Sequence, residues 1–254
     1  MKSTIIYKQC LIYLFFTATV FFGLYLNEDL GGGALYDYNI HKQTIDKLFA
    51  NGLSFGFLNY NNFSNSHSPL FIMMLSFLIS NNEIIGRLIY LIISSLVVLT
   101  FYKILALKYK KDFLALFVLS NFFLLSPYFR SYAIWPGDET VAIIFFCLSI
   151  YFFIRFISSN NKPVIFLILN IISLAIASYL RPIYCIFFVY YFFNFIIERK
   201  FDLKIFIFYI ILNFFLAFPA FYYVFILDVN FFAYSLVGFN IVNSFTLAYL
   251  TIFF

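Results

Sequence analysis

An acidic residue and a histidine stand four positions apart in a polar segment that follows the first apolar run. Asp37 and His41 lie within residues 36–50, where polar and apolar side chains alternate with the period of an α-helix. At about 100° per residue, Asp37, His41 and Ile45 share one face, which we expect to turn toward the membrane. A carboxylate in such a place can act as a general base toward a bound hydroxyl group, with the imidazole as its helper or as a substrate contact.

A simpler interpretation of this pair stays open. Asp37 stands near the helix start, where a carboxylate caps the first turn or complements the helix dipole. His41 can be an imidazole tolerated at the membrane interface. Glu28 and Asp29, at the end of the preceding apolar run, are alternative acids for the same chemistry, or they only mark where that run leaves the membrane.

Four more charged side chains stand where apolar runs are interrupted. Arg130 precedes the adjacent acids Asp138 and Glu139, and Arg181 directly precedes Pro182. An arginine near membrane depth usually has a function, and guanidinium groups suit phosphate. We therefore predict that both arginines contact an anionic group and that the two acids form a second acidic site. The alternatives are a snorkelling role for Arg130 and a dipole role for the acids.

The composition defines the elements that must position these side chains. With 64% hydrophobic and 11% charged residues, the chain is predicted to be one integral membrane domain, residues 1–254. The net charge of +5 comes mostly from lysines at the ends of apolar runs, which indicates topology and no nucleic-acid partner. The three cysteines show no disulfide or zinc spacing. Trp135 and the many tyrosines are expected to be interface anchors.

The predicted fold is all-α, a polytopic transmembrane helix bundle with an amphipathic interfacial helix in its first external loop. The first span is expected to be an uncleaved signal-anchor. Residues 69–80 are too short to cross and are predicted to be a short or re-entrant segment. About eight spans are expected, at residues 10–26, 84–107, 113–125, 141–158, 164–180, 183–197, 205–227 and 231–254.

The charges assign a side to each end of these spans. With both termini in the cytoplasm, most of the 16 basic residues lie inside: Lys2, Lys8, Lys103, Lys108, Lys110, Lys111, Arg155, Lys162, Arg199, Lys200 and Lys204. Most of the 11 acids lie outside: Glu28, Asp29, Asp37, Asp46, Glu83, Asp138, Glu139 and Asp228. The candidate residues then share the outer face, and a sugar on a lipid phosphate is a substrate that fits them.

Three segments resemble the GT-C superfamily of polyprenyl-phosphate-sugar-dependent membrane glycosyltransferases. Residues 37–41 look like the Asp-x-x-x-His variant of the family's first external loop. Ser66 to Phe71 is similar to the proline-containing start of its next membrane segment. Arg130-Ser131 and Asp138-Glu139 look like the second external loop of oligosaccharyltransferase catalytic subunits, and Arg181-Pro182 is similar to a later span end.

The resemblance, which covers roughly residues 1–200, implies an inverting transfer on the outer face of a bacterial inner membrane. Asp37 would be the base, Arg130 and Arg181 the phosphate contacts, and a glycan, lipid or protein the acceptor. A divalent ion, Mg²⁺ or Mn²⁺, is the only cofactor considered. The adjacent Asp138 and Glu139 depart from the family's spaced acids, which leaves that metal open.

Two other classes of function are also open. A transporter or flippase of lipid-linked sugars would use the same charges for binding alone. A non-catalytic membrane subunit would need neither base nor donor site. Family members are commonly longer, with a C-terminal half that helps to recognise the acceptor, so the resemblance implies either a truncated chain or a partner subunit.

Overall fold

All the secondary structure in the part of the chain that the computed structural model describes is helical. The described residues are 2–29, 33–60, 69–79, 82–109, 112–159, 164–198 and 203–225. The elements are α1 (Lys2–Tyr25), α2 (Ala34–Asn51), α3 (Leu53–Leu58), α4 (Pro69–Ile79), α5 (Glu83–Ser94), α6 (Leu96–Lys108), α7 (Phe113–Ser120), η2 (Asn121–Leu125), α8 (Pro127–Ile134), α9 (Asp138–Ser158), α10 (Val164–Leu180), η3 (Pro182–Ile186), α11 (Phe187–Glu198) and α12 (Leu203–Phe225). The all-α prediction is confirmed.

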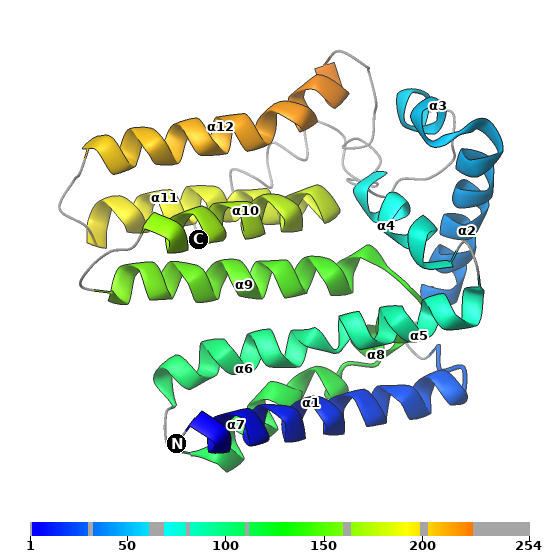
Figure 1. Ribbon diagram of the computed structural model, residues 1–254, viewed down its shortest axis with the longest axis horizontal. Coiled ribbons are helices and arrows are strands. Elements are labelled where there is room, and N and C mark those ends of the chain that lie inside the picture. Colours follow the sequence, from blue (N-terminus) through cyan, green and yellow to red (C-terminus); the bar gives the residue numbers. More distant parts are fainter. Residues whose placement is uncertain are drawn as a thin grey trace.

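The long helices lie side by side in a stack, and α2 lies across one end of it (Figure 1). Helix α1 runs toward this end, which we call the α2 end, and α5 and α9 start there. Helix α10 also finishes at the α2 end. The chain reversals that carry Asp37, Asp138 and Arg181 are therefore gathered at one end, as the predicted topology requires.

Fewer helices are long enough to cross a membrane than the eight spans expected. In the described ranges, four apolar helical segments meet the length for a span: 6–25, 83–107, 138–158 and 203–221. Helices α7, η2 and α8 form a fifth if they are counted as one span, bent by 77°. Helices α4 and α10 and the segment Pro182–Asn194 are apolar but shorter. The last expected span, residues 231–254, lies outside the described residues.

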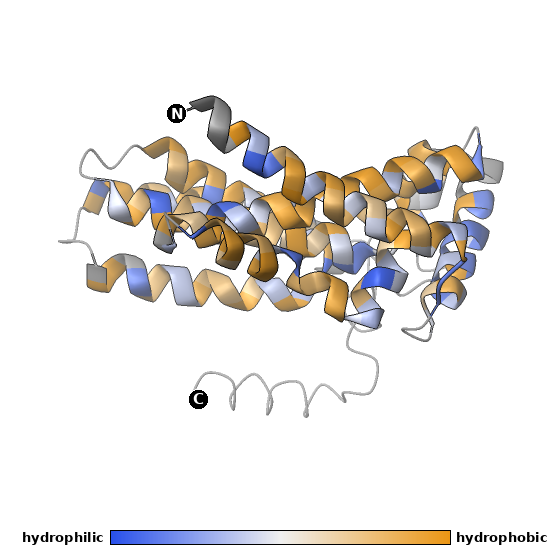
Figure 2. Ribbon diagram, turned by 90° about the horizontal axis from the view of Figure 1, so that it is seen from below, coloured by the Kyte–Doolittle hydropathy of each residue, from blue (hydrophilic) through white to orange (hydrophobic). Residues whose placement is uncertain are grey.

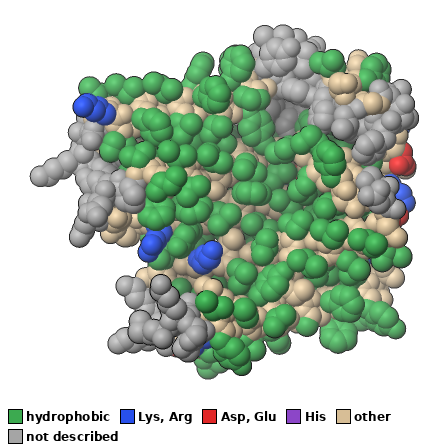
Figure 3. Space-filling model, in the orientation of Figure 1, with side chains coloured by type: hydrophobic (Ala, Val, Ile, Leu, Met, Phe, Trp, Pro, Cys, Tyr) green, Lys and Arg blue, Asp and Glu red, His purple; other side chains and the backbone are tan. Residues whose placement is uncertain are grey.

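The surface of the stack is apolar along its length and charged at its ends. Hydrophobic residues dominate the sides of the long helices (Figure 2). On the face shown in Figure 3, the acidic side chains lie at the α2 end and lysine or arginine side chains also lie at the opposite end. Large exposed side chains such as Phe214, Phe215 and Phe218 of α12 suit contact with lipid. The chain is thus a multi-pass membrane protein by length and composition.

Helix α2 confirms the predicted interfacial helix but not the direction of its apolar face. It covers Ala34–Asn51, against the predicted 36–50. His41 is 0% exposed and Ile45 is 3% exposed, because this face packs into the protein rather than against lipid. The short helix α4 fills the space beside it. It lies at the α2 end and is shorter than a span, and the statement that residues 69–80 do not cross stays a prediction.

A sharp turn joins α8 to α9. Ser126 begins α8 as its N-cap, since its hydroxyl accepts from the backbone N–H of Phe129, and Pro127 fits the first helical position. Gly137 precedes α9 and lies so close to Tyr132 that a Cβ would overlap the phenol ring. Only glycine therefore allows Tyr132 and the acids of α9 to approach each other this closely.

Candidate functional site

The Asp37 carboxylate of α2 is held by a tyrosine of α8. The Tyr132 hydroxyl donates to Asp37 Oδ2 at 2.5 Å, across 95 residues of sequence. Tyr132 itself is 5% exposed, whereas Asp37 keeps part of its surface open. The predicted base therefore has one oxygen fixed by a buried donor and remains within reach of a ligand.

A second tyrosine connects Asp37 to the acidic pair of α9. The rings of Tyr128 and Tyr132 have centroids 4.5 Å apart, and the Tyr128 hydroxyl donates to Glu139 Oε1 at 3.2 Å. Tyr128 is 46% exposed and covers the buried Tyr132. The predicted base and the predicted second acidic site thus belong to one continuous cluster.

Arg181 pairs with both acids of α9. Its guanidinium lies 3.0 Å from Asp138 Oδ1 and also contacts Glu139. Asp138 is 1% exposed, so its charge requires such a partner. The structure brings Asp37, Asp138, Glu139 and Arg181 together through Tyr128 and Tyr132, and we call these six residues the tyrosine-linked cluster.

Arg130 belongs to the opposite side of α8. It pairs with Glu28, the first of the two alternative acids, and its guanidinium also contacts the Leu124 carbonyl at 3.5 Å. The Trp135 indole donates to the Glu28 carbonyl at 3.1 Å. Arg130 and Glu28 thus join the end of α1 to α8, and their ion pair is separate from those of Arg181.

The remaining predicted residues lie apart from the tyrosine-linked cluster. The His41 ring packs edge-on against Phe71 of α4 at 5.1 Å, and full burial keeps this ring away from a surface ligand. Asp29 is half-buried, and its Oδ1 makes no hydrogen bond within the described ranges. The role of His41 as a helper of Asp37 stays a prediction.

The acids present do not fit a divalent metal ion. In the described part of the chain, no three of His, Cys, Asp and Glu lie close enough together to hold a metal ion. Asp138 and Glu139 both face the Arg181 guanidinium, which already neutralises part of their charge. A metal ion bound to these two carboxylates would have to displace the Arg181 guanidinium, which belongs to the chain itself.

Sequence reasoning missed Arg87 and misplaced Trp135. Arg87 of α5 stands over the Trp135 indole, 3.6 Å from the ring centroid, and donates to the Ile134 carbonyl at 3.4 Å. Trp135 is 7% exposed, so it is a buried side chain and not the expected interface anchor. An arginine four residues into an apolar span was the available signal, since such residues mark functional sites.

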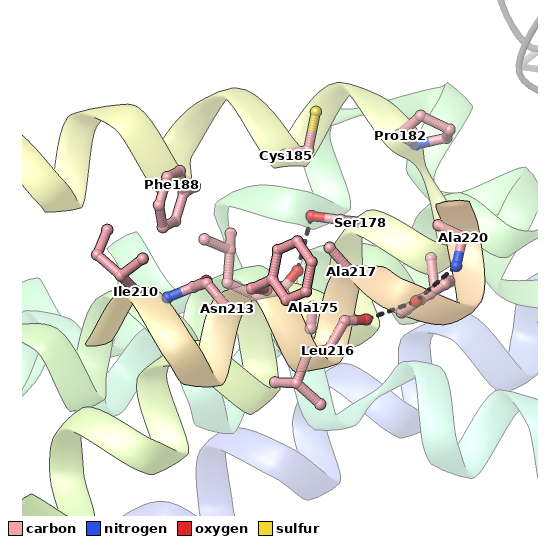
Figure 4. Close-up of a pocket in the computed structure, with 13 residues that line it drawn as sticks. Ala175, Ser178, Pro182, Cys185, Phe188, Ile210, Asn213, Leu216, Ala217 and Ala220 are labelled. Atoms are coloured by element: carbon pink, nitrogen blue, oxygen red, sulfur yellow. Dashed lines mark hydrogen bonds between the residues drawn. The ribbon is translucent and has the colours of Figure 1, made fainter. Parts of the chain in front are cut away.

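An apolar groove of about 510 Å³ runs between α10, η3, α11 and α12, next to Arg181 (Figure 4). Pro182, the neighbour of Arg181 in sequence, lies at one end of it, and Asn213, Ser178 and Tyr179 are its polar side chains. Cys185 is an exposed free cysteine on its wall. One end of the groove therefore lies at the residue that follows Arg181 in the chain.

A tyrosine of α10 holds α12 at one side of this groove. Pro219 lies inside α12 and removes a backbone donor. The Tyr179 hydroxyl donates to the Leu216 carbonyl at 2.6 Å and accepts from the Ala220 N–H at 3.2 Å (Figure 4). Tyr179 thus bridges a carbonyl and an N–H that lie on either side of Pro219.

Comparisons with known proteins give this chain no relative. No family model, no curated protein and no solved structure matches it. The function is therefore inferred from the site.

Proposed function

We propose that the protein is an inverting membrane glycosyltransferase of GT-C type that takes its sugar from a polyprenyl-phosphate donor. The observation that carries this proposal is the tyrosine-linked cluster, with Asp37 and Arg181 at its two ends, beside an apolar groove. A lipid-linked sugar needs a carboxylate base, a cation for its phosphate and an apolar surface for its tail.

Asp37 accepts the proton of the acceptor hydroxyl group in this proposal. The acceptor oxygen forms a bond to the anomeric carbon while the bond from that carbon to the phosphate oxygen breaks. The electron pair of the broken bond leaves with the polyprenyl phosphate, and attack from the opposite side inverts the anomeric centre. Tyr132 holds one oxygen of Asp37, which leaves the other free to take the proton.

Arg181 binds the phosphate of the donor. Its present partners are two carboxylates, and together the three groups carry a net charge of about −1. A phosphate therefore has to take over at least one of the guanidinium donors from Glu139, the more exposed of the two acids. Negative charge grows on the departing phosphate, so a guanidinium placed there favours the transition state. Arg130 would add to this only if Glu28 released it.

The groove receives the hydrocarbon tail of the donor. Its walls are apolar side chains such as Leu174, Phe188 and Ile210, and Pro182 at its end adjoins the phosphate contact Arg181. Burying apolar chain is worth about 25 cal/mol per Å² of surface removed from water. A donor with a long tail is expected to bind much more tightly than one whose tail is too short to enter.

Membranes that contain the protein should transfer label from one of a panel of radiolabelled polyprenyl-phosphate sugars. Label that appears in an acceptor only in membranes with the protein supports the proposal. Binding of a donor, seen as protection of Cys185 from a maleimide in a variant without Cys10 and Cys147, provides a second readout. Protection without transfer from any donor would favour the transporter or flippase. The absence of both protection and transfer would contradict the proposal.

A further inference from the structure

Helix α5 presents polar side chains on one face, although it belongs to an apolar segment long enough to span a membrane. Glu83, Arg87, Tyr90 and Ser94 follow one another at steps of three or four residues, which places them along one helix face. Tyr90 and Ser94 are 0% exposed. Buried polar groups in an apolar helix require partners, and these partners define what α5 holds.

Three of these side chains bind the end of α8 and the turn after it. Arg87 Nε donates to the Ile134 carbonyl at 3.4 Å, and the Tyr90 hydroxyl donates to the Gly137 carbonyl at 2.5 Å. The Ser94 hydroxyl also lies 3.4 Å from the Ala133 carbonyl, although its shorter hydrogen bond, at 2.9 Å, is to the Leu91 carbonyl of α5 itself. The last carbonyls of a helix have no partner inside that helix, so α5 supplies the donors that α8 lacks at its C-terminus.

The start of α5 holds α2 in the same way. Lys42 Nζ donates to Glu83 Oε2 at 2.5 Å, and this hydrogen bond raises the pKa of Lys42. Burial, more than the nearby Glu83 charge, raises the pKa of Tyr38 on the same helix. The Tyr38 ring lies 5.8 Å from the Trp135 ring, which the Arg87 guanidinium also contacts.

We propose that α5 is a bracket that sets the position of Asp37 against Tyr132, with Arg87 as its central positioning residue. Glu83 holds α2, which carries Asp37, and Arg87 and Tyr90 hold the turn that follows Tyr132. The bond between Asp37 and Tyr132 is the place where these two held elements meet. The expected effect of this bracket on sugar transfer rests on the proposed function, whereas its effect on the position of the turn does not.

The guanidinium is suited to this place because it acts on two groups at once. Its plane covers the indole of Trp135, and its Nε binds the neighbouring carbonyl. One terminal nitrogen of Arg87 is buried with no hydrogen-bond partner in the described part of the chain. Burial of a charged group inside an apolar helix is costly, and such residues usually have a function. We therefore expect the Arg87 guanidinium to be important for the position of Trp135 and the turn beside it.

Trp135 is the only tryptophan of the chain, so its fluorescence reports the turn directly. The test compares wild type with Arg87→Met and Tyr90→Phe, each as the full chain purified in lipid nanodiscs. Both variants should shift Trp135 emission to the red and increase its quenching by acrylamide, with the larger change in Arg87→Met. In a transfer assay, kcat should fall about 10- to 100-fold, the cost of misplacing a catalytic group by about 1 Å, with KM for the donor little changed.

Arg155→Met is the matched control. Arg155 also lies over an aromatic ring, that of Phe166 at 5.5 Å, but in the last turn of α9, away from Trp135. This variant should keep the wild-type emission and kcat. Unchanged emission in both folded α5 variants would overturn the proposal that α5 is a bracket. A higher KM for the donor with an unchanged kcat would overturn it as well. If wild type transfers no sugar, the proposed function fails, while the emission measurement still decides whether α5 holds the turn.

Discussion

At the Asp37 carboxylate the observed neighbour is the phenol hydroxyl of Tyr132, and the His41 imidazole is buried against Phe71. A hydrogen bond to one oxygen fixes the rotamer of an otherwise mobile carboxylate, and this orientation is what a general base needs. The geometry of the base therefore depends on whatever keeps the Tyr132 ring in place.

Gly137→Ala tests this dependence at a residue that has no side chain of its own. The added Cβ would overlap the Tyr132 ring and would lie 2.9 Å from Glu139 Oε2. Tyr132 must then move away from Asp37, and we expect transfer to fall about 100-fold. The measurement is kcat with a saturating donor.

Tyr132→Phe separates the ring from the hydroxyl. It removes the bond of the hydroxyl to Asp37 and its interaction with Tyr128 but leaves the ring in place, so the loss of transfer rate should be smaller than that of Gly137→Ala. The double variant should be no worse than Gly137→Ala alone, because both changes act on the same contact. Losses that add independently would show that Gly137 acts in some other way.

Sequence alone could predict Asp37 and the acids of α9 as candidates, because charge is rare in an apolar chain and therefore visible. It could not predict Tyr128 or Tyr132, because the chain has 21 tyrosines and nothing in the sequence distinguishes these two. Their hydrogen-bond partners are also distant in sequence. The pairing of Arg181 with Asp138 and Glu139 was equally hidden, although all three were named as site residues. Contacts between helices that are distant in sequence depend on tertiary packing, so no local sequence pattern predicts them.

The interruptions between helices position the site residues more than the long apolar helices do. Apolar runs predicted the helices because hydropathy is a local property. The 77° bend between the α7 segment and α8 comes from Ser126, which takes an extended conformation and caps α8, followed by Pro127. This bend turns α8 so that Tyr128 and Tyr132 face α2 and α9, an orientation that the hydropathy profile does not contain.

Tyr179→Phe tests the break in α12. Without the hydroxyl, the Leu216 carbonyl and the Ala220 N–H lose their bonds to Tyr179 on either side of Pro219. The net contribution of such a hydrogen bond is about 0.5–1.5 kcal/mol. We expect a lower thermal midpoint of the detergent-solubilised protein and weaker protection of Cys185 by polyprenyl phosphate. Tyr190→Phe on α11, where the ring is 56% exposed, is the control. Equal midpoints for the two variants would show that Tyr179 does not stabilise α12.

The whole molecule has two chemically different ends joined by apolar sides. The tyrosine-linked cluster, the bracket of α5 and one end of the groove all lie at the α2 end. A lipid-linked substrate has the same arrangement of polar head and apolar tail, and the positive-inside rule predicts that the α2 end faces outward.

Cysteine labelling tests this orientation. In a variant without Cys10, Cys147 and Cys185, a cysteine at Ser54 should react with an impermeant maleimide added to intact cells. A cysteine at Ser158, which is exposed at the other end of α9, should react only after lysis. Reaction of Ser158→Cys in intact cells, with Ser54→Cys protected, would reverse the topology.

The most direct test of the account is the rate of sugar transfer by Asp37→Asn. This change keeps the size of the side chain and its bond to Tyr132 but removes the basicity. A positioned general base contributes about 10²- to 10⁴-fold in rate, or about 3–5.5 kcal/mol at 1.36 kcal/mol per decade. Asp46→Asn, on the exposed face of the same helix, is the matched control and should stay within a few-fold of wild type. Near-complete loss in the first variant alone is the predicted result, and an Asp37→Asn protein that transfers sugar at the wild-type rate would contradict the account.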